Sequence, residues 1–201
     1  MNVDTSTPTG LMRARDLGII HSGLMDIIYS PEFGFTAKTI FSPENQASVF
    51  FLFRDPVERS ISIWEHSQEK LSGMKLEEYI KLGNIEKNPL TRLILQKHGV
   101  ELHNEDKYRA MEIIRRKVLV GLTSRLEESL ERFRRFYGWP DWTDCVNKII
   151  ASDHELKNTL EVQYKGPAWS VIAHENDYDM ELYEYATVLF DEQASLVEQE
   201  P

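Results

Sequence analysis

The chain has 201 residues, of which 41% are hydrophobic and 28% are charged, a composition typical of a folded globular protein. Its formal net charge of −10 repels nucleic acid and anionic membranes, so a local basic cluster must hold any anionic ligand. A single cysteine, Cys145, excludes an internal disulfide and a multi-cysteine metal site. No apolar run approaches the ~18 residues of a membrane span, and residues 1–10 lack the pattern of a signal peptide.

The N-terminal part of the chain carries weak structural signals. Residues 1–15 open with a polar stretch rich in Thr and Pro, which predicts a disordered lead-in. Residues 16–198 are predicted to form a single domain, because their number suits one hydrophobic core. Within this domain, the short apolar stretch 16–23 predicts a strand, and residues 30–46, which have no clear period, predict a loop.

The strongest strand signal is the continuous apolar run at residues 48–53, which is typical of a parallel strand buried on both faces. A helix is predicted to follow at once, since Asp55 is a favourable N-cap residue and Pro56 suits the first helical position. The core-facing stripe of this helix has the spacing i, i+4, i+7 and consists of Val57, Ile61 and Trp64.

The remainder of the chain predicts mostly helices around one further buried strand. The expected helices cover residues 75–82, 89–97, 105–116, 123–137 and about 143–151, with a last amphipathic helix capped by Asp177. Residues 117–122 predict the second strand, and residues 152–168 predict irregular structure. Two buried strands, each followed by a helix and separated by helical crossovers, indicate an α/β fold with a parallel sheet of few strands and a helix-rich C-terminal half.

Arg54 follows the first strand directly, and ligands of open α/β sheets bind outside the carboxyl ends of the strands. Ser62 lies about two helical turns beyond the cap, on the side of the helix start. A guanidinium and a hydroxyl in this arrangement can hold one phosphate. The alternative is that Arg54 pairs with Asp55 or a neighbouring Glu and that Ser62 is only a small helix residue.

The segment Leu52–His66 resembles the RDPxxRxxS segment of Golgi-type and related carbohydrate sulfotransferases, which depend on PAPS (3′-phosphoadenosine 5′-phosphosulfate) and have a P-loop fold. The segments 120–130, 137–139 and 176–186 resemble a later strand–helix pair and the terminal helix of the same family. The resemblance covers roughly residues 45–195. It implies that Arg54 and Ser62 bind the 3′-phosphate of PAPS.

The resemblance also implies an activity, which is transfer of a sulfuryl group from PAPS to a hydroxyl acceptor of the carbohydrate class, without a metal ion. A form carrying an N-terminal anchor would be expected in the Golgi. Arg59 has two interpretations: a supporting role at the phosphate, or a surface salt bridge with Glu58 or Glu65. His21 lies in a segment that loosely resembles the one bearing the catalytic base of uronyl 2-O-sulfotransferases, and its alternative is an ordinary loop or capping residue.

One departure from the family concerns the loop that holds the 5′-phosphosulfate. The sequence contains neither G-x-x-x-x-G-K-[ST] nor a Pro-Lys-x-Gly-[ST]-[ST] run. We therefore expect either a domain that is incomplete at its N-terminal side or a degenerate paralogue. In the second case the chain is a catalytically inactive module that binds a nucleotide or a protein.

Overall fold

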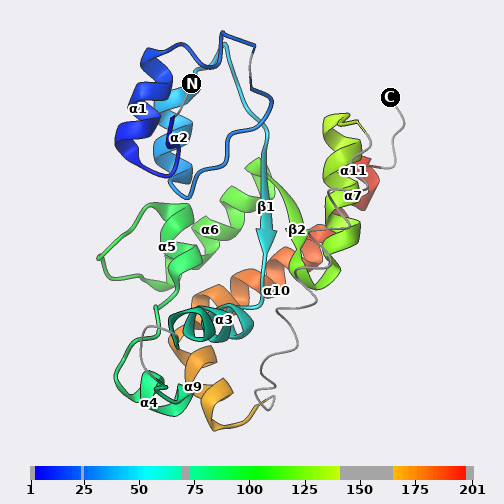
Figure 1. Cartoon of the computed structure of the whole chain (residues 1–201). Helices are drawn as coiled ribbons and strands as arrows, with labels where there is room; N and C mark the ends of the chain where they lie inside the picture. The colour runs from blue at the N-terminus through cyan, green and yellow to red at the C-terminus, as the bar shows by residue number, and fades with distance from the viewer. Residues whose placement is uncertain (1–2, 24, 69–72, 141–164, 198–201) are drawn as a thin grey trace.

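The computed structural model describes residues 3–23, 25–68, 73–140 and 165–197. The two strands are β1 (Val49–Phe53) and β2 (Val118–Leu122). The helices are α1 (Pro8–Asp16), α2 (Phe33–Ile40), α3 (Pro56–Gln68), α4 (Leu76–Lys81), α5 (Pro89–Leu95), α6 (Asn104–Lys117), α7 (Leu126–Tyr137), α9 (Pro167–Glu175), α10 (Asp177–Glu192) and α11 (Ala194–Val197), and a 3₁₀ turn (Thr123–Arg125) precedes α7. Figure 1 shows this arrangement.

The two strands pair in parallel, in a register that runs from Val49 opposite Val118 to Phe53 opposite Leu122. Helices α3 to α6 form the crossover between them, as expected for parallel neighbours, which no tight turn can join. The prediction of a parallel sheet of few strands flanked by helices is confirmed at this level: the described residues form a helix-rich chain around one two-stranded sheet.

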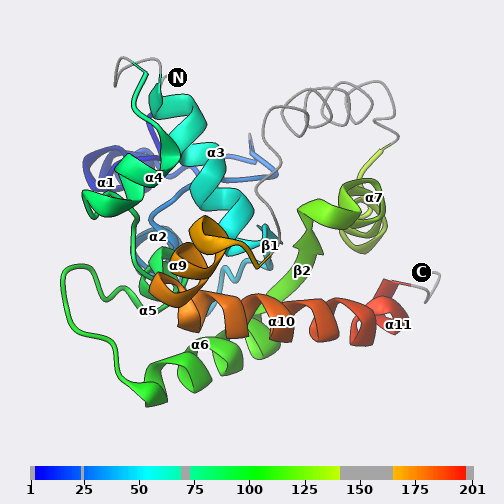
Figure 2. The same ribbon diagram turned by 90° about the horizontal axis from the view of Figure 1, so that it is seen from below.

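One face of the sheet packs on α5, α6 and α10, and α6 and α10 run side by side beneath it (Figure 2). The buried residues of this core are Phe53, Ile94, Ala110, Ile114, Val118, Val120, Leu122, Leu182, Ala186, Leu189 and Phe190. The other face packs on α7, where the ring centroids of Phe50 and Phe133 lie 4.8 Å apart. Gly121 permits this approach, because an added Cβ would meet Phe133 Cζ at 2.5 Å.

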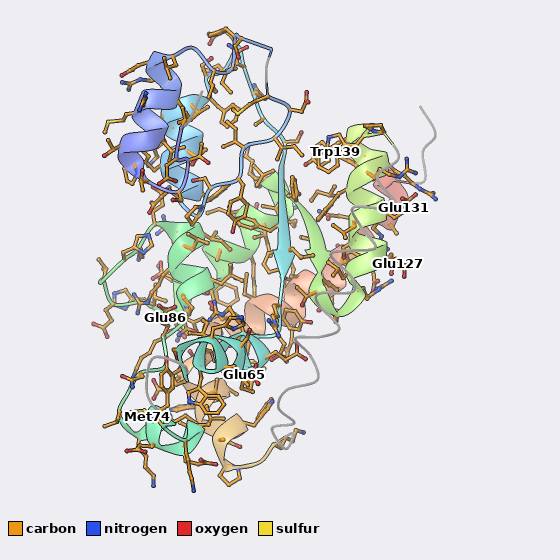
Figure 3. The ribbon with its side chains drawn as sticks, viewed as in Figure 1. Glu65, Met74, Glu86, Glu127, Glu131 and Trp139 are labelled. Carbon is orange, nitrogen blue, oxygen red and sulfur yellow. The ribbon has the colours of Figure 1, made fainter. Side chains whose placement is uncertain are left out.

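The surface of α7 that faces away from the sheet is charged, and Glu127 and Glu131 point outward there (Figure 3). Glu131 accepts hydrogen bonds from Arg134 and Arg135, which lower its pKa to about 2. Trp139 lies at the carboxyl end of the helix, stacked on Tyr137 at a centroid distance of 4.9 Å. On this face, Glu131 therefore forms intrahelical ion pairs with Arg134 and Arg135.

The backbone N–H and C=O groups on the outer edge of β2 form hydrogen bonds with side chains in place of a third strand. Gln193 accepts a hydrogen bond from the Val120 N–H at 2.9 Å and donates one to the Val118 carbonyl at 2.9 Å. Ser129 Oγ accepts from the Leu122 N–H at 2.8 Å. Since buried backbone groups need partners, these two side chains replace a neighbouring strand.

Three sequence-based expectations for the N-terminal part differ from the structure. Residues 8–16 form α1 within the predicted lead-in, because Thr7 caps the helix and Leu11 and Ala14 are fully buried beside Ile40 of α2. Residues 17–23 form turns where a strand was predicted. Residues 33–40 form α2 where a loop was predicted. In each case a small tertiary contact between α1 and α2 outweighs weak local signals.

The first strand is also less buried than its sequence predicts. Leu52 is 41% exposed, and only Phe53 of β1 is fully buried. Both strands are edge strands of the two-stranded sheet that the described residues form, so the difference comes from the helices around them: α6, α7 and α10 all pack on β2, which is buried along its whole length.

Toward the C-terminus the main addition is α9, whose first two residues, Pro167 and Ala168, were predicted to be irregular. The helix predicted near 143–151 and most of 152–168 lie outside the described residues. The last predicted helix is confirmed as α10, but Asp177, predicted as its cap, is its first residue, and Asn176 occupies the N-cap position. Within the described part of the chain, no helix has both the length and the apolar character required to cross a membrane.

We predict that Gln193→Ala lowers the free energy of unfolding by about 2–4 kcal/mol, because it leaves a buried N–H and a buried carbonyl of β2 without partners. Urea denaturation followed by circular dichroism measures the change. The control is Glu192→Ala at the exposed neighbouring position, which should cost less than about 0.5 kcal/mol. Equal, small effects of the two substitutions would contradict the role of Gln193.

Candidate functional site

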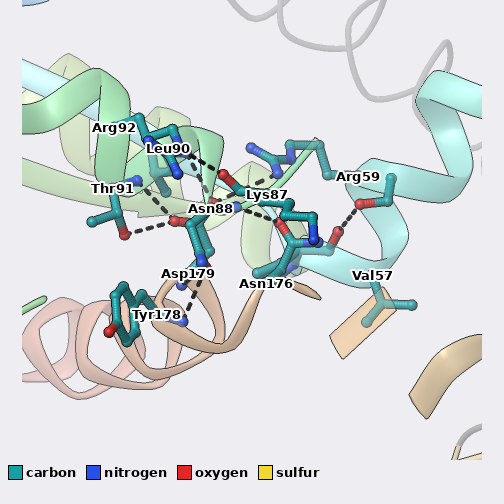
Figure 4. Close-up of polar contacts among 12 residues, drawn as sticks. Val57, Arg59, Lys87, Asn88, Leu90, Thr91, Arg92, Asn176, Tyr178 and Asp179 are labelled. Carbon is teal, nitrogen blue, oxygen red and sulfur yellow. Dashed lines mark hydrogen bonds and ion pairs between the residues drawn. The ribbon is translucent and has the colours of Figure 1, made fainter. Parts of the chain in front are cut away.

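Helices α5 and α10 begin at the same point, and each is capped by a side chain of the other (Figure 4). Asp179 of α10 accepts hydrogen bonds from Leu90 N at 2.9 Å, from Thr91 N at 2.8 Å and from Thr91 Oγ1 at 2.7 Å. Asn88, just before α5, accepts from Tyr178 N and Asp179 N, both at 3.0 Å. Both residues are buried, so the unpaired N–H groups of two helices are satisfied without water.

Arg59 of α3 reaches this junction from the other side, and its Nη2 lies 3.6 Å from Asp179 Oδ2. Burial lowers the pKa of Arg59, while the charges of Asp179 and Glu86 oppose the shift. The Nε and Nη2 atoms of Arg59 are buried, and no described residue accepts a hydrogen bond from them. The guanidinium therefore pairs with Asp179 and with neither Glu58 nor Glu65, the partners predicted from the sequence.

Arg54 occupies the predicted position at the carboxyl end of β1. The helix that follows begins as expected, because Asp55 Oδ1 accepts hydrogen bonds from Val57 N at 2.8 Å and Glu58 N at 3.0 Å. Arg54 Nε lies 3.7 Å from Glu58 Oε2, which is the neighbouring acid that the sequence offered as an alternative partner. This distance exceeds that of a hydrogen bond, and Nε is buried without an acceptor among the described residues.

Ser62 lies on α3 beside an open hollow of about 320 Å³ that Ile63, His66 and Ser67 also line. Ser62 is half-buried and lies outside the hydrophobic stripe of the helix. Arg54 is not among the described residues that line this hollow. Glu58, the ion-pair partner of Arg54, lies one helical turn before Ser62 on α3.

The structure does not bring His21 to Arg54 and Ser62. His21 lies in an exposed turn after α1, where its backbone N–H donates to the Gly18 carbonyl at 3.0 Å. Helix α1 packs on α2 at the amino end of β1, whereas α3 starts from the carboxyl end (Figure 1). The segment that contains His21 therefore lies at the opposite end of the strand from Arg54.

Sequence reasoning missed the capping residues of the junction and the position of His66. The dipeptide Asn88-Pro89 is a recognisable start signal for a helix, so Asn88 was accessible as a local cap. Its partners lie about ninety residues away, as the separation of 91 between Asn88 and Asp179 shows, and no local pattern contains them. His66 lies four residues after Ser62. On a helix this spacing permits a contact between the two residues but does not require one.

Comparison with known proteins found no matching family model, no matching curated protein and no matching solved structure. Among the described residues, no group of three or more His, Cys, Asp or Glu side chains is arranged to hold a metal ion. The chemistry of the site therefore has to be argued from Arg54, Arg59, Ser62 and their surroundings.

We predict that substitution by glycine has opposite effects on stability at Asn88 and at Gln96, which have similar backbone conformations. Asn88 and Gln96 both have positive φ, 49° and 55°. Asn88→Gly should destabilise the protein by about 1–2 kcal/mol, because it removes the cap of α10. Gln96→Gly at the end of α5 should leave stability unchanged or raise it by up to about 1 kcal/mol, because glycine tolerates this conformation.

Thermal unfolding of the two variants measures these changes. If Asn88→Gly were as stable as the wild type, the backbone conformation alone would account for the presence of Asn88, and the capping role would be wrong.

Proposed function

We propose that the chain is a sulfotransferase-like protein of the PAPS-dependent type, in which the start and outer face of α3 bind the 3′-phosphate of the nucleotide. Arg54 and Ser62 are the proposed ligands. The reaction is transfer of a sulfuryl group from PAPS to a hydroxyl acceptor, for which a carbohydrate is the proposed class.

The observation that carries the proposal is the buried Nε of Arg54, which lacks an acceptor at the carboxyl end of a parallel strand. A buried guanidinium N–H without a partner costs free energy, and an anionic oxygen placed there would remove this cost. Parallel strands direct their carboxyl ends toward the ligand in open α/β sheets. The donor chemistry of the residues present therefore fits a phosphate group.

Bound PAPS would supply the activated sulfuryl group itself. Arg54 and Ser62 would position the nucleotide, because holding its 3′-phosphate end orients the rest of the molecule. The chain has a net charge of −10, and this local cation is what offsets the repulsion of an anionic ligand.

A second candidate function is a module that binds a nucleotide and transfers nothing. The observation that favours it is the absence from the sequence of a Walker-type phosphate loop, whose donors would stabilise the charge on the 5′-phosphate leaving group. Losing even one such donor typically costs about 2.7–4 kcal/mol in the transition state. A radiolabelled PAPS assay with a panel of hydroxyl acceptors separates the two: turnover supports the transferase, and binding without turnover supports the module.

Isothermal titration with adenosine 3′,5′-bisphosphate tests the phosphate site. We expect Arg54→Ala to weaken binding at least about tenfold, because it removes a charge-assisted hydrogen bond. Arg116→Ala is the matched control, since it also removes one positive charge and also breaks an ion pair with a Glu four residues away, on α6. Equal affinities of the two variants would exclude Arg54 as a ligand.

Glu58 competes with a phosphate for Arg54, so Glu58→Gln should tighten the binding of adenosine 3′,5′-bisphosphate by about two- to fivefold, the range of a surface ion pair. The control is Glu127→Gln on α7, which changes the net charge by the same amount far from α3. A tightening of the same size in both variants would mean that only the net charge of the protein matters.

A further inference from the structure

The hollow beside Ser62 contains an imidazole to which neither the sequence nor the proposed site assigns a role. His66 lines the hollow together with Ser62, and its side chain is exposed. No described acid forms an ion pair with it. The residue is therefore accessible to a ligand that enters the hollow.

A single hydrogen bond fixes the orientation of this imidazole. His66 Nδ1 lies 2.7 Å from the backbone carbonyl oxygen of Ser62. A carbonyl oxygen only accepts hydrogen bonds, so Nδ1 carries the hydrogen. The other ring nitrogen, Nε2, is then the atom that can interact with a ligand.

The neighbours of His66 along the helix are suited to an anion. Arg59, Ser62 and His66 follow one another at spacings of three and four residues, which places them on one face of α3. No described residue accepts a hydrogen bond from the Ser62 hydroxyl, so it is free to donate. Arg59 has two buried donor atoms without an acceptor, as described above. Ser62 and His66 thus present a hydroxyl and an imidazole nitrogen to the hollow, whereas Arg59 lies against Asp179 and is not among the described residues that line it.

We propose that this hollow receives the 3′-phosphate and that His66 is a further ligand of it. This inference rests on the proposed function and extends its site from Arg54 and Ser62 to the face of α3 beyond them. A hydrogen bond between His66 Nε2 and a phosphate oxygen needs one proton, carried by either atom, and it is charge-assisted because the phosphate is an anion.

The Ser67 hydroxyl, which also lines the hollow, is already engaged. It donates to the Trp64 carbonyl at 2.9 Å and does not supply a further donor for an anion.

A different role for the His66 imidazole would be that of a general base for the acceptor hydroxyl. The two roles differ in what they change, because a phosphate ligand affects nucleotide affinity and a base for the acceptor does not.

The test compares two nucleotides that differ only in the 3′-phosphate, adenosine 3′,5′-bisphosphate and adenosine 5′-monophosphate, by isothermal titration of the full chain. We expect His66→Ala to weaken binding of the bisphosphate about tenfold and to leave binding of the monophosphate unchanged. His66→Lys should restore most of the lost affinity, because it places an ammonium donor at the same position on α3. His98→Ala is the control, since it removes another exposed histidine outside α3.

The outcomes separate this inference from the proposed function. If the wild type binds both nucleotides equally, or if Arg54→Ala has no effect, the phosphate site itself is wrong and the inference fails with it. If the wild type prefers the bisphosphate and Arg54→Ala removes the preference while His66→Ala does not, only the role of His66 is overturned. Circular dichroism of each variant confirms that it is folded, and His66→Gln provides a second neutral substitution if the alanine variant is not.

Discussion

The structure depends on one constraint, which is that two helix N-termini meet in the interior and have to satisfy each other. Helices α5 and α10 each leave N–H groups unpaired at their first turns, and burial removes water as a partner. Asp179 and Asn88 meet this requirement reciprocally, so neither helix can move without breaking the cap of the other. The first turns of both helices are thereby fixed relative to each other.

This junction also positions the candidate site. The carboxylate of Asp179 is the charge nearest to Arg59 and holds its guanidinium against α10. Arg59 lies in the first turns of α3, so the junction fixes the start of the helix whose outer face carries Ser62 and His66. The strand before α3 is fixed in turn by its pairing with β2, whose other edge Gln193 and Ser129 close. The phosphate-binding face that we propose is thus supported by contacts from β2 and from α10.

The electrostatics of this face differ from those of the whole protein. A chain with a net charge of −10 binds an anion only where cations are concentrated and partly desolvated. Arg54 and Arg59 both retain a buried donor atom without an acceptor, which is an uncommon state in a folded protein. Glu58 weakens the attraction of Arg54 for an anion, because its carboxylate lies close enough to the guanidinium to compete with a ligand.

The sequence by itself determined the strand–helix unit from Val49 to Gln68, the second strand and most of the later helices, because apolar periodicity and the Asp55-Pro56 cap act within a few residues. It also singled out Arg54 and Ser62. Only the tertiary structure decided that α1 and α2 are helices, that Arg59 pairs with Asp179 and that His21 lies at the far end of β1. The reason is physical: these outcomes depend on contacts between distant segments, such as the hydrogen bond across 91 residues from Asp179 to Asn88, and a local pattern contains no information about its distant partner.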